Sequence, residues 1–397
     1  MSEIPPIVTA GPGPAPESLV FAVPEGKRIS VGAPSLLALP NGKLLVAFDQ
    51  AGPDVKGLAG SKGHDAKRNR WMQGRVMCSS DGGTTWQLVV TYPFRRASLF
   101  RDGGDVYLAG EAAGGLCLMR SPDGGGSWSA PLELTSDLDL WLSPTTVLSA
   151  DDNWLLPCLV PAGQGMGLTI WRAPKGASLM NRKAWVQGPV SLPLSQWVPV
   201  VRGAGFGVPL AGATVAWRNP VLIKITDPRH PWHAARVVQV FTAVDSGRQH
   251  WAAMLRLSTE DWSLTHQVTP DGDPWVWLPQ PGGHEKFDLL HDEPRGRYWL
   301  VASRGSPHVA LGRGPAAEAG LLSLGLWSSA NLVDWCFAGE VVSGRAGPAG
   351  IRCDPAAAIS GRDLVVACRA GGPHTRNVRE TSQLTVVRFA DFRSREA

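Results

Sequence analysis

Charged side chains follow or open short apolar runs at several well-separated places in this chain. Asp49, Glu111, Arg304 and Arg369 each come directly after such a run, and Asp354 lies just before another. A pair of carboxylates can serve as acid and as base or nucleophile in the cleavage of a glycosidic bond, while arginines bind carboxylates through paired hydrogen bonds. These residue types therefore predict an acid–base site for a negatively charged ligand, provided that the fold brings them together.

A wider set of polar residues lies beside similar runs and completes the candidate site. The predicted catalytic groups are Asp49, Asp65, Glu111, His284 and Asp354. The predicted substrate-binding groups are Arg68, Trp217, Lys286, Arg304, Arg352 and Arg369. One such charge alone is more often an ordinary solvated loop residue, but its recurrence at equivalent places favours a common pocket. Tryptophans in predicted loops are candidates for stacking on sugar rings, namely Trp71, Trp141, Trp197, Trp217 and Trp232.

Two copies of one turn motif indicate which elements position these residues. Residues 79–86 read Ser-Ser-Asp-Gly-Gly-Thr-Thr-Trp and residues 121–128 read Ser-Pro-Asp-Gly-Gly-Gly-Ser-Trp, so both fit S-x-D-x-G-x-[ST]-W. The aspartate can accept hydrogen bonds from its own turn, and glycine supplies a positive φ. Apolar runs beside each copy predict a β-hairpin. We therefore assign structural roles to Ser79, Asp81, Gly83, Trp86, Ser121, Asp123, Gly125 and Trp128.

The spacing of the turns predicts a repeat architecture. Their aspartates are 42 residues apart, which matches one four-stranded blade of a β-propeller. A tryptophan opens a predicted outer strand in five places, at Trp86, Trp128, Trp185, Trp262 and Trp335. The sixth unit ends with the chain, so we expect residues 18–24 to supply its outer strand beside 384–388. The sequence thus predicts an all-β, six-bladed β-propeller of four-stranded antiparallel blades; a seventh blade would have to lie within 188–260.

The turn motif and its spacing resemble the Asp-box, or BNR, repeat of sialidases and related propellers. The blade pattern covers nearly the whole chain, and it implies a single sialidase-like domain over 1–397 in which 1–17 form a loose arm. The resemblance implies a carbohydrate-active enzyme, an exo-acting glycoside hydrolase on a terminal sugar that the arginines suggest is acidic. In that family the motif closes a hairpin away from the catalytic face, so it predicts the fold and not the reaction.

Several hallmarks of true sialidases have no counterpart here, so the resemblance implies a divergent member. Pro34 matches the proline of the family's Arg-Ile-Pro motif, but Gly32 takes the place of an arginine that binds the sialic acid carboxylate. Residues 352–354 (Arg-Cys-Asp) stand where the nucleophilic tyrosine is expected, and 212–214 (Gly-Ala-Thr) where its glutamate partner is expected. Asp65 is the best match to the family's acid. We therefore expect sialidase activity to be weak or absent.

Composition narrows the classes of function. The 397-residue chain has a net charge of +4 without a basic stripe, so nucleic acid is not an expected partner. No apolar run approaches the ~18 residues of a membrane span, so no membrane partner is expected. The first residues lack the features of a signal peptide, which favours a cytoplasmic location and leaves secretion of a processed form open. The six cysteines form no CxxC motif and are predicted to be small core residues, and no cofactor is expected.

Two other functions stay open from the sequence. The chain could be a non-catalytic propeller that binds sugar or protein, or a polysaccharide lyase in which His284 or His64 is the base and an arginine neutralises a uronate. Two carboxylates, or a histidine and an arginine, that meet in one pocket would favour an enzyme. His230 and His233 are separated by a proline, so a zinc site is not expected. The sugar and the oligomeric state are not predicted.

Overall fold

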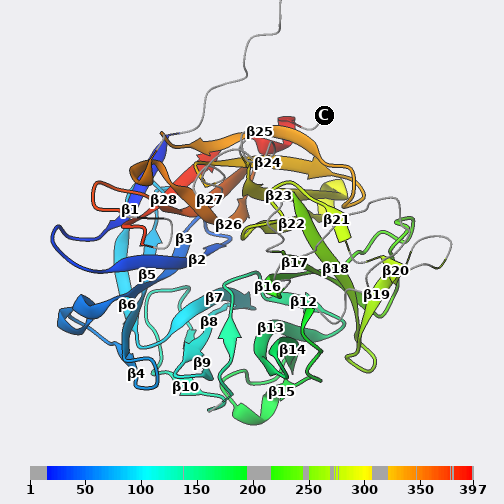
Figure 1. Ribbon diagram of the computed structural model, residues 1–397, viewed down its shortest axis with the longest axis horizontal. Helices are drawn as coiled ribbons and strands as arrows, with labels where there is room; N and C mark the ends of the chain where they lie inside the picture. Colours follow the sequence, from blue (N-terminus) through cyan, green and yellow to red (C-terminus); the bar gives the residue numbers. More distant parts are fainter. Residues whose placement is uncertain are drawn as a thin grey trace, which may run out of the picture.

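The computed structural model shows six antiparallel β-sheets arranged as blades around a central axis (Figure 1). It describes residues 16–136, 138–194, 216–244, 250–268, 272, 274–275, 277–305, 321–345, 347–375, 377 and 380–395. The prediction of an all-β, six-bladed propeller is therefore confirmed. Most of the predicted N-terminal arm, residues 1–15, lies outside the described residues. In the described part of the chain, no helix is long and apolar enough to cross a bilayer.

The first three blades follow one another along the chain. Blade 1 contains β2 (Ser30–Ala38), β3 (Leu44–Ala51), β5 (Arg70–Ser79) and β6 (Gln87–Tyr92), with β4 (Gly63–Asp65) added beside β5. Blade 2 contains β7 (Arg95–Asp102), β8 (Asp105–Ala112), β9 (Gly115–Ser121) and β10 (Leu132–Glu133). Blade 3 contains β12 (Leu148–Ala150), β13 (Asn153–Ala162), β14 (Gly165–Pro174) and β15 (Val186–Gln187), with β11 (Trp141–Leu142) also paired to β13.

The remaining blades complete the ring. Blade 4 contains β16 (Arg218–Ile223), β17 (Val237–Ala243), β18 (Trp251–Ser258) and β19 (Leu264–Val268), extended by β20 (Pro274–Trp275) and β21 (Trp277–Pro279). Blade 5 contains β22 (Asp288–Asp292), β23 (Arg297–Ser303), β24 (Ser323–Ser329) and β25 (Cys336–Ser343). Blade 6 contains β26 (Arg352–Ser360), β27 (Asp363–Ala370), β28 (Gln383–Phe389) and β1 (Glu17–Ala22). The described 3₁₀ helices are short, with three to five residues each, such as η1 (Pro53–Gly57).

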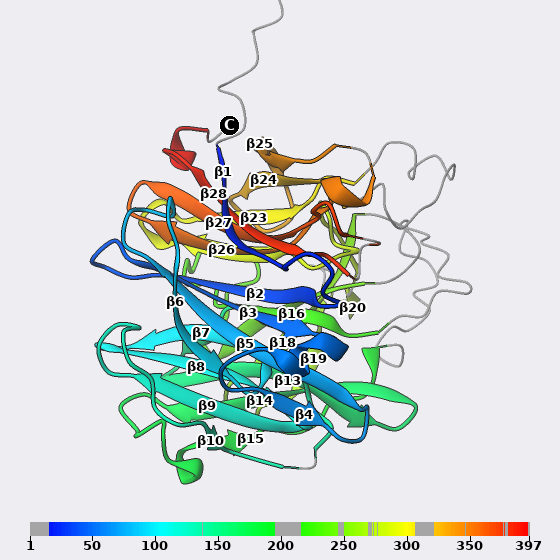
Figure 2. The same ribbon diagram turned by 90° about the vertical axis from the view of Figure 1, so that its left-hand side faces the viewer.

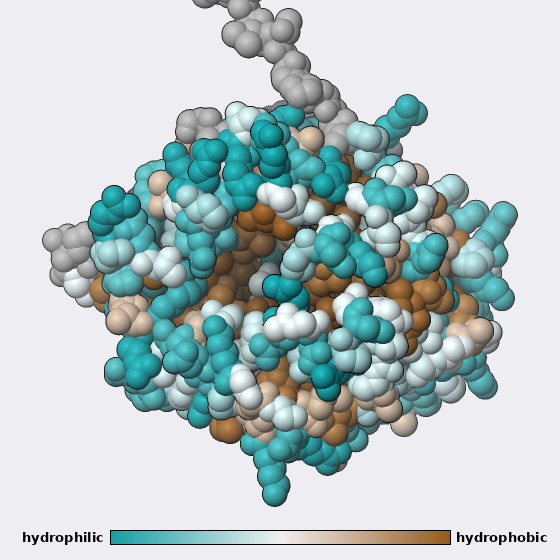
Figure 3. Space-filling model, turned by 180° about the vertical axis from the view of Figure 1, so that it is seen from behind, coloured by the Kyte–Doolittle hydropathy of each residue, from teal (hydrophilic) through white to brown (hydrophobic). Residues whose placement is uncertain are grey.

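The hydrophobic core lies between the blades. Apolar clusters fill the space between each pair of neighbours, as where Val46 and Phe48 of blade 1 pack with Val365 and Leu384 of blade 6. Each sheet is therefore buried on both faces, and all eight residues of β3 are buried. The strands nearest the axis are β2, β7, β12, β16, β22 and β26 (Figure 1). On the face seen in Figure 3, apolar side chains gather around a central hollow and polar ones cover the rim.

Side chains of the innermost strands also connect adjacent blades. The Ser35 hydroxyl of β2 accepts the backbone N–H of Leu99 in β7 at 2.9 Å, and the Asp288 carboxylate of β22 accepts that of Ala357 in β26 at 2.7 Å. Burial raises the pKa of Asp288 to about 6, and the hydrogen bond from Ala357 opposes this effect. All six cysteines are free; Cys336 is exposed, against the expectation that the cysteines are core residues.

The predicted closure of the ring by the N-terminal strand is confirmed. β1 pairs antiparallel with β28, with Ser18 opposite Val386, so both ends of the chain share blade 6 (Figure 2). The side chains of Val20 and Val23 are buried in the cluster between blades 6 and 1. The Ser18 hydroxyl donates to the carbonyl of Gly83 at 2.6 Å, which joins this strand to the first turn motif of blade 1.

Hydrogen bonds explain the residue pattern of the two turn motifs. Asp81 accepts the backbone N–H groups of Thr84 and Thr85, while the Ser79 hydroxyl donates to Asp81 at 2.7 Å and accepts the N–H of Gly83 at 2.8 Å. The bonds from Thr85 hold the pKa of Asp81 well below its usual range. Asp123 repeats this network in blade 2. Both turns thus connect neighbouring strands and contribute no residue to the cavity described below.

Truncation of β1 tests the closure. Removal of residues 1–23 deletes the outer strand of blade 6, including the buried Val20 and Val23, and leaves the edge of β28 unpaired. We expect the free energy of unfolding to fall by about 3–5 kcal/mol, because burial of one such side chain contributes ~1.5–3 kcal/mol. Chemical denaturation measures the change. Removal of residues 1–15 keeps β1 whole and is the matched control; identical unfolding of both truncated chains would contradict the closure.

Candidate active site

Residues from all six blades line one cavity of about 390 Å³, here called the axial cavity. Its lining residues are Ser30, Val31, Gly32, Ala33, Asp49, Ala51, Arg70, Arg95, Arg96, Trp141, Leu142, Ser143, Pro144, Arg218, Asn219, Lys286, Asp354 and Arg369. A concave site of this size is large enough for a sugar-sized ligand. Of the predicted site residues, the structure brings Asp49, Lys286, Asp354 and Arg369 together here.

Bulges at matching positions of four innermost strands shape this cavity. The pairing register of β2, β7, β16 and β26 skips within the segments 32–35, 95–98, 218–221 and 353–356. Inside the bulges, Ala33, Arg96, Asn219 and Asp354 have φ values of 45–53°, a region that non-glycine residues seldom adopt. All four line the axial cavity. The bulges therefore end regular pairing and present these residues at the cavity wall, a common use of bulges beside functional sites.

The axial cavity carries an excess of positive charge. Its lining contains six basic side chains and two carboxylates. The basic residues are Arg70, Arg95, Arg96, Arg218, Lys286 and Arg369, contributed by five of the six blades. Grouped cations repel one another unless negative charge lies between them, so this cavity favours an anionic ligand.

Glu111 does not line the cavity but supports two of its arginines from behind. Its Oε1 accepts from Arg95 at 2.6 and 3.0 Å, and its Oε2 accepts from Arg96 at 2.9 Å. The Glu111 side chain is 2% exposed, so this is a buried charge cluster in which one carboxylate serves two guanidinium groups. Glu111, which we predicted as a catalytic group, thus occupies the place of a positioning residue.

Asp49 combines burial with an incomplete set of partners. Its Oδ2 accepts the backbone N–H of Arg96 at 2.7 Å, whereas its Oδ1 is buried and has no hydrogen-bond partner among the described residues. Burial raises the pKa of Asp49 to about 7, and the hydrogen bond from Arg96 only partly offsets it. Asp49 is therefore a carboxylic acid that can hold its proton near neutral pH.

Asp354 has the opposite electrostatic surroundings. Burial alone would raise its pKa, but the positive charges of Arg369 and Lys286 keep the pKa of Asp354 below its usual value. Its Oδ2 accepts from Arg369 Nη1 at 2.7 Å, and Arg369 Nε donates to the Thr381 hydroxyl at 2.9 Å. The buried Lys286 Nζ donates to the carbonyl of Pro34 at 3.2 Å. Asp354 is thus an ionised carboxylate, whereas Asp49 in the same cavity can hold its proton.

An aromatic ring lies at the edge of the same cavity. Trp141 is 46% exposed, and the guanidinium of Arg96 lies 3.3 Å from the centre of its ring. The ring is fixed by this cation–π contact and by the pairing of β11 with β13. Among the described tryptophans that we predicted to stack on sugars, Trp141 alone lines the axial cavity. Trp197 lies outside the described residues.

Seven predicted site residues do not line the axial cavity: Glu111, the loop residues Asp65 and Arg68, and four others. Arg304 forms an ion pair with Glu340 and lies over the ring of Phe337, both in β25. Arg352 pairs with Glu17 of β1 at 2.6 Å. The other two are Trp217 and His284. Trp217 is 3% exposed and donates to the carbonyl of Leu192, and His284 packs edge-on against His250. The expected convergence is thus realised for Asp49, Asp354 and Arg369 and not for Arg304 and His284.

The charged residues of the blade 1 loop pair with one another and with Asp139, which precedes β11. Asp65 is buried and accepts from the backbone N–H of Arg68 at 3.1 Å and from its Nη1 at 3.0 Å. Although burial opposes it, these bonds keep the pKa of Asp65 below its usual value. The exposed His64 hydrogen-bonds Asn69 and lies against Trp71. None of Asp65, Arg68 and His64 lines the axial cavity, so the residue expected to match the family's acid lies outside it.

Sequence reasoning missed four of the cavity's basic residues: Arg70, Arg95, Arg96 and Arg218. A usable signal was present in the residue pairs Ala33-Pro34, Asn219-Pro220 and Asp354-Pro355, which recur within the innermost strands. Proline lacks the N–H that regular pairing requires, so it marks a bulge or an edge within a sheet. Comparison of these pairs across the blades would have placed Asn219 and Asp354 at equivalent sites, with Arg218 directly before the first of them. Among the described residues, no group of His, Cys, Asp and Glu is arranged to hold a metal ion.

Replacement of Glu111 tests its positioning role. In Glu111→Gln the two arginines lose their shared negative charge while the shape of the side chain is kept. We expect the free energy of unfolding to fall by about 3 kcal/mol, because removal of one partner leaves buried charge uncompensated. Urea denaturation measures the loss. Glu133→Gln, an exposed position in β10, is the control and should change stability little; equal effects of the two substitutions would contradict this account.

The raised pKa of Asp49 predicts a pH-dependent stability. Between about pH 4 and pH 7 the unfolded chain loses the Asp49 proton while the folded chain retains it, so the stability of the native protein falls as pH rises. An asparagine side chain cannot ionise, so Asp49→Asn should be more stable than the native protein at pH 8 by ~2–4 kcal/mol, and by less at pH 5. Thermal melting at both pH values measures this. Asp102→Asn, outside the cavity, is the control; a pH-independent difference for Asp49→Asn would contradict burial of this carboxyl.

Comparison with known proteins identifies the fold but no family. No family model matches the chain, and no curated protein matches it. A Dyadobacter fermentans protein of unknown function superposes with a TM-score of 0.58 at 14% identity, over 94% of this chain and 98% of that one. The intramolecular trans-sialidase from Ruminococcus gnavus superposes with a TM-score of 0.55 at 12% identity, over 94% of this chain and 97% of that one. The NanB sialidase from Streptococcus pneumoniae superposes with a TM-score of 0.53 at 11% identity, over 94% of this chain and 70% of that one. At these identities the likeness shows that this chain shares the propeller fold of those sialidases.

Proposed function

We propose that this protein is a glycoside hydrolase that removes a terminal acidic sugar bound in the axial cavity. The observation that carries the proposal is the pair Asp49 and Asp354, two carboxyl groups in one cavity whose pKa values are shifted in opposite directions. Such a pair suits the division of labour in glycoside cleavage, in which one carboxylic acid donates a proton and one carboxylate acts on the anomeric carbon or on water.

The two roles follow from the two environments. Asp49, protonated near neutral pH, donates its proton to the glycosidic oxygen as the bond to the leaving sugar breaks. Asp354, ionised beside Arg369, stabilises the positive charge that develops on the ring and either attacks the anomeric carbon or activates a water molecule. The anomer released first distinguishes these two routes, because attack by Asp354 retains the configuration and attack by water inverts it.

The basic residues supply recognition of the acidic group. Arg95 and Arg96 are held in place by Glu111 and Arg369 by Asp354 and Thr381, so these side chains are ordered before a ligand arrives. Ordered guanidinium groups bind a carboxylate or sulfate with little loss of side-chain entropy. The exposed ring of Trp141 at the cavity edge suits stacking against the face of a sugar.

A sialidase mechanism with a tyrosine nucleophile has no support in this cavity. The chain has three tyrosines, and Tyr92, Tyr107 and Tyr298 all lie outside the cavity lining. The Tyr92 hydroxyl donates to the carbonyl of Phe48, and burial raises its pKa well above the usual value. The three tyrosines thus agree with the expectation, drawn from Gly32 and Asp354, that activity on sialosides is weak or absent.

Hydrolysis of defined aryl glycosides tests the proposal. We expect release of 4-nitrophenol from a uronide, such as the β-glucuronide, and much less from the matching β-glucoside, which lacks the carboxylate. Asp49→Asn should lower kcat by roughly 100-fold or more, since a general acid typically contributes 10²–10⁴-fold. Arg369→Ala should chiefly raise KM for the uronide. The kcat/KM of the native enzyme should fall above about pH 7, where Asp49 of the free enzyme loses its proton.

The control is Asp102→Asn, at the far end of β7 from the cavity, which should retain kcat. Circular dichroism confirms that each variant is folded. Specific binding of uronides without turnover of any acidic glycoside would show a carbohydrate-binding propeller in place of an enzyme. Equal turnover of the uronide and the glucoside would contradict the role of the basic residues.

A further inference from the structure

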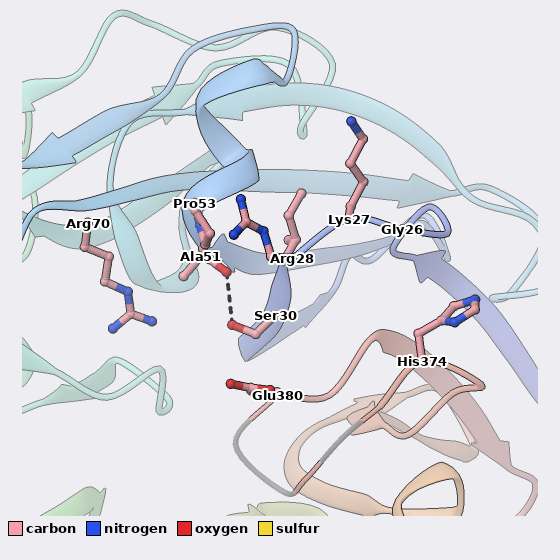
Figure 4. Close-up of a pocket in the computed structure, with 11 residues that line it drawn as sticks. Gly26, Lys27, Arg28, Ser30, Ala51, Pro53, Arg70, His374 and Glu380 are labelled. Carbon is pink, nitrogen blue, oxygen red and sulfur yellow. Dashed lines mark hydrogen bonds between the residues drawn. The ribbon is translucent and has the colours of Figure 1, made fainter.

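We propose that a second cavity beside the axial one is the binding site for the leaving sugar, and that this sugar is uncharged. This inference rests on the proposed function and extends it from a terminal sugar to an acidic sugar linked to a neutral one. The second cavity has a volume of about 530 Å³ and is built from the segments 26–30 and 51–53 of blade 1 together with Arg70, His374 and Glu380 (Figure 4).

The two cavities share a wall. Ser30, Ala51 and Arg70 line both of them. The Ser30 hydroxyl donates to the carbonyl of Ala51 at 3.1 Å, which joins the ends of β2 and β3 at this boundary (Figure 4). A ligand that fills the axial cavity and continues past these three residues therefore enters the second cavity.

The position of Asp49 fits a bond broken at this boundary. Asp49 and Ala51 are two residues apart in β3, so their side chains lie on the same face of the strand about 7 Å apart. Asp49 lines the axial cavity and Ala51 lines both. The general acid is thus within about one sugar ring of the second cavity. A proton donor belongs beside the oxygen of the leaving group, which makes the second cavity the place for that group.

The second cavity has one carboxylate, Glu380, among the basic lining residues Lys27, Arg28 and Arg70. Arg70 and Glu380 point into the space from opposite walls, while the ammonium of Lys27 is turned away from both (Figure 4). The Arg28 guanidinium is held by Asp54, at 3.0 Å from Nη2 to Oδ1, so its charge is already compensated. Arg70 and Glu380 then face the ligand with opposite charges, and the Glu380 carboxylate repels a second acidic group there. Paired donors and acceptors of this kind suit the hydroxyl groups of a neutral sugar.

The blade 1 side of the second cavity is closely packed. Gly52, which follows β3, has a φ of 144°, and a Cβ atom there would lie 2.2 Å from the carbonyl oxygen of Arg28. The backbone therefore packs directly against the segment before β2. Asp54 in η1 also accepts the backbone N–H of Arg28 at 2.7 Å. The second cavity is thus formed before a ligand binds, and its affinity is not reduced by ordering of this wall.

Binding of matched sugars to Asp49→Asn, in which turnover is slowed roughly 100-fold or more, tests the inference. The probes are methyl β-glucuronide and a disaccharide of glucuronic acid linked to xylose, with N-acetylneuraminic acid and 3′-sialyllactose as a second pair. Calorimetry should show that the disaccharide of glucuronic acid binds at least 10-fold more tightly than the monosaccharide. Adding Glu380→Ala should reduce this gain to less than threefold and leave the affinity for methyl β-glucuronide unchanged. Glu293→Ala, exposed on blade 5, is the matched control and should leave both affinities unchanged.

The outcomes separate this inference from the proposed function. Equal affinities for mono- and disaccharide, with uronide hydrolysis intact in the native enzyme, would overturn the second site and leave the hydrolase. Tighter binding of the disaccharide that depends on Glu380, with no hydrolysis by the native protein, would support the second site and overturn the hydrolase. Absence of binding by every probe would overturn both.

Discussion

Closure of the ring is the constraint on which the rest of this structure depends. Five blades draw all four main strands from one continuous stretch of chain, but the sixth needs β1 from the opposite end to cover β28. Val20 and Val23 then complete the apolar cluster between blades 6 and 1, so the closing strand stabilises two blades at once. The axial cavity depends on the same closure, because its wall is made of residues from all six blades, with Asp354 and Arg369 in blade 6 facing a cavity shared with Asp49 in blade 1.

The axial cavity brings six basic side chains together, and few carboxylates compensate their charge. Glu111 compensates Arg95 and Arg96 from behind the wall, and Asp354 compensates Arg369 within it. Because Glu111 already satisfies the two neighbouring guanidinium groups, Asp49 receives only a backbone hydrogen bond from Arg96, and burial dominates its protonation. The same cluster therefore fixes the anion-binding arginines and leaves an acid beside them in its neutral form.

The sequence predicted the architecture well because the architecture is repetitive. The turns at Asp81 and Asp123 depend on hydrogen bonds within a few residues of sequence, and a tryptophan precedes the outer strand of five blades, so both patterns can be recognised without tertiary information. The site was predicted less well, because the cavity depends on bulges in the innermost strands, and a bulge changes which side chains face the axis. Arg304 follows an apolar run just as Arg369 does, yet it turns to Glu340 of its own blade. Which of the two arginines reaches the axis is decided by neighbouring strands and not by the run that precedes it.

The charge distribution also couples ligand binding to the protonation of Asp49. An anion that enters the axial cavity adds negative charge near both Asp49 and Asp354. A nearby like charge disfavours ionisation, so a bound acidic sugar raises the pKa of Asp49 further and secures its proton for transfer. Asp354 resists the same effect, because its ion pair with Arg369 and the charge of Lys286 stabilise the carboxylate directly. A neutral sugar of equal size brings no such charge, so it leaves Asp49 partly ionised near neutral pH. Discrimination between acidic and neutral sugars then arises in the chemical step as well as in binding, since the ligand's own charge keeps the acid in its active form.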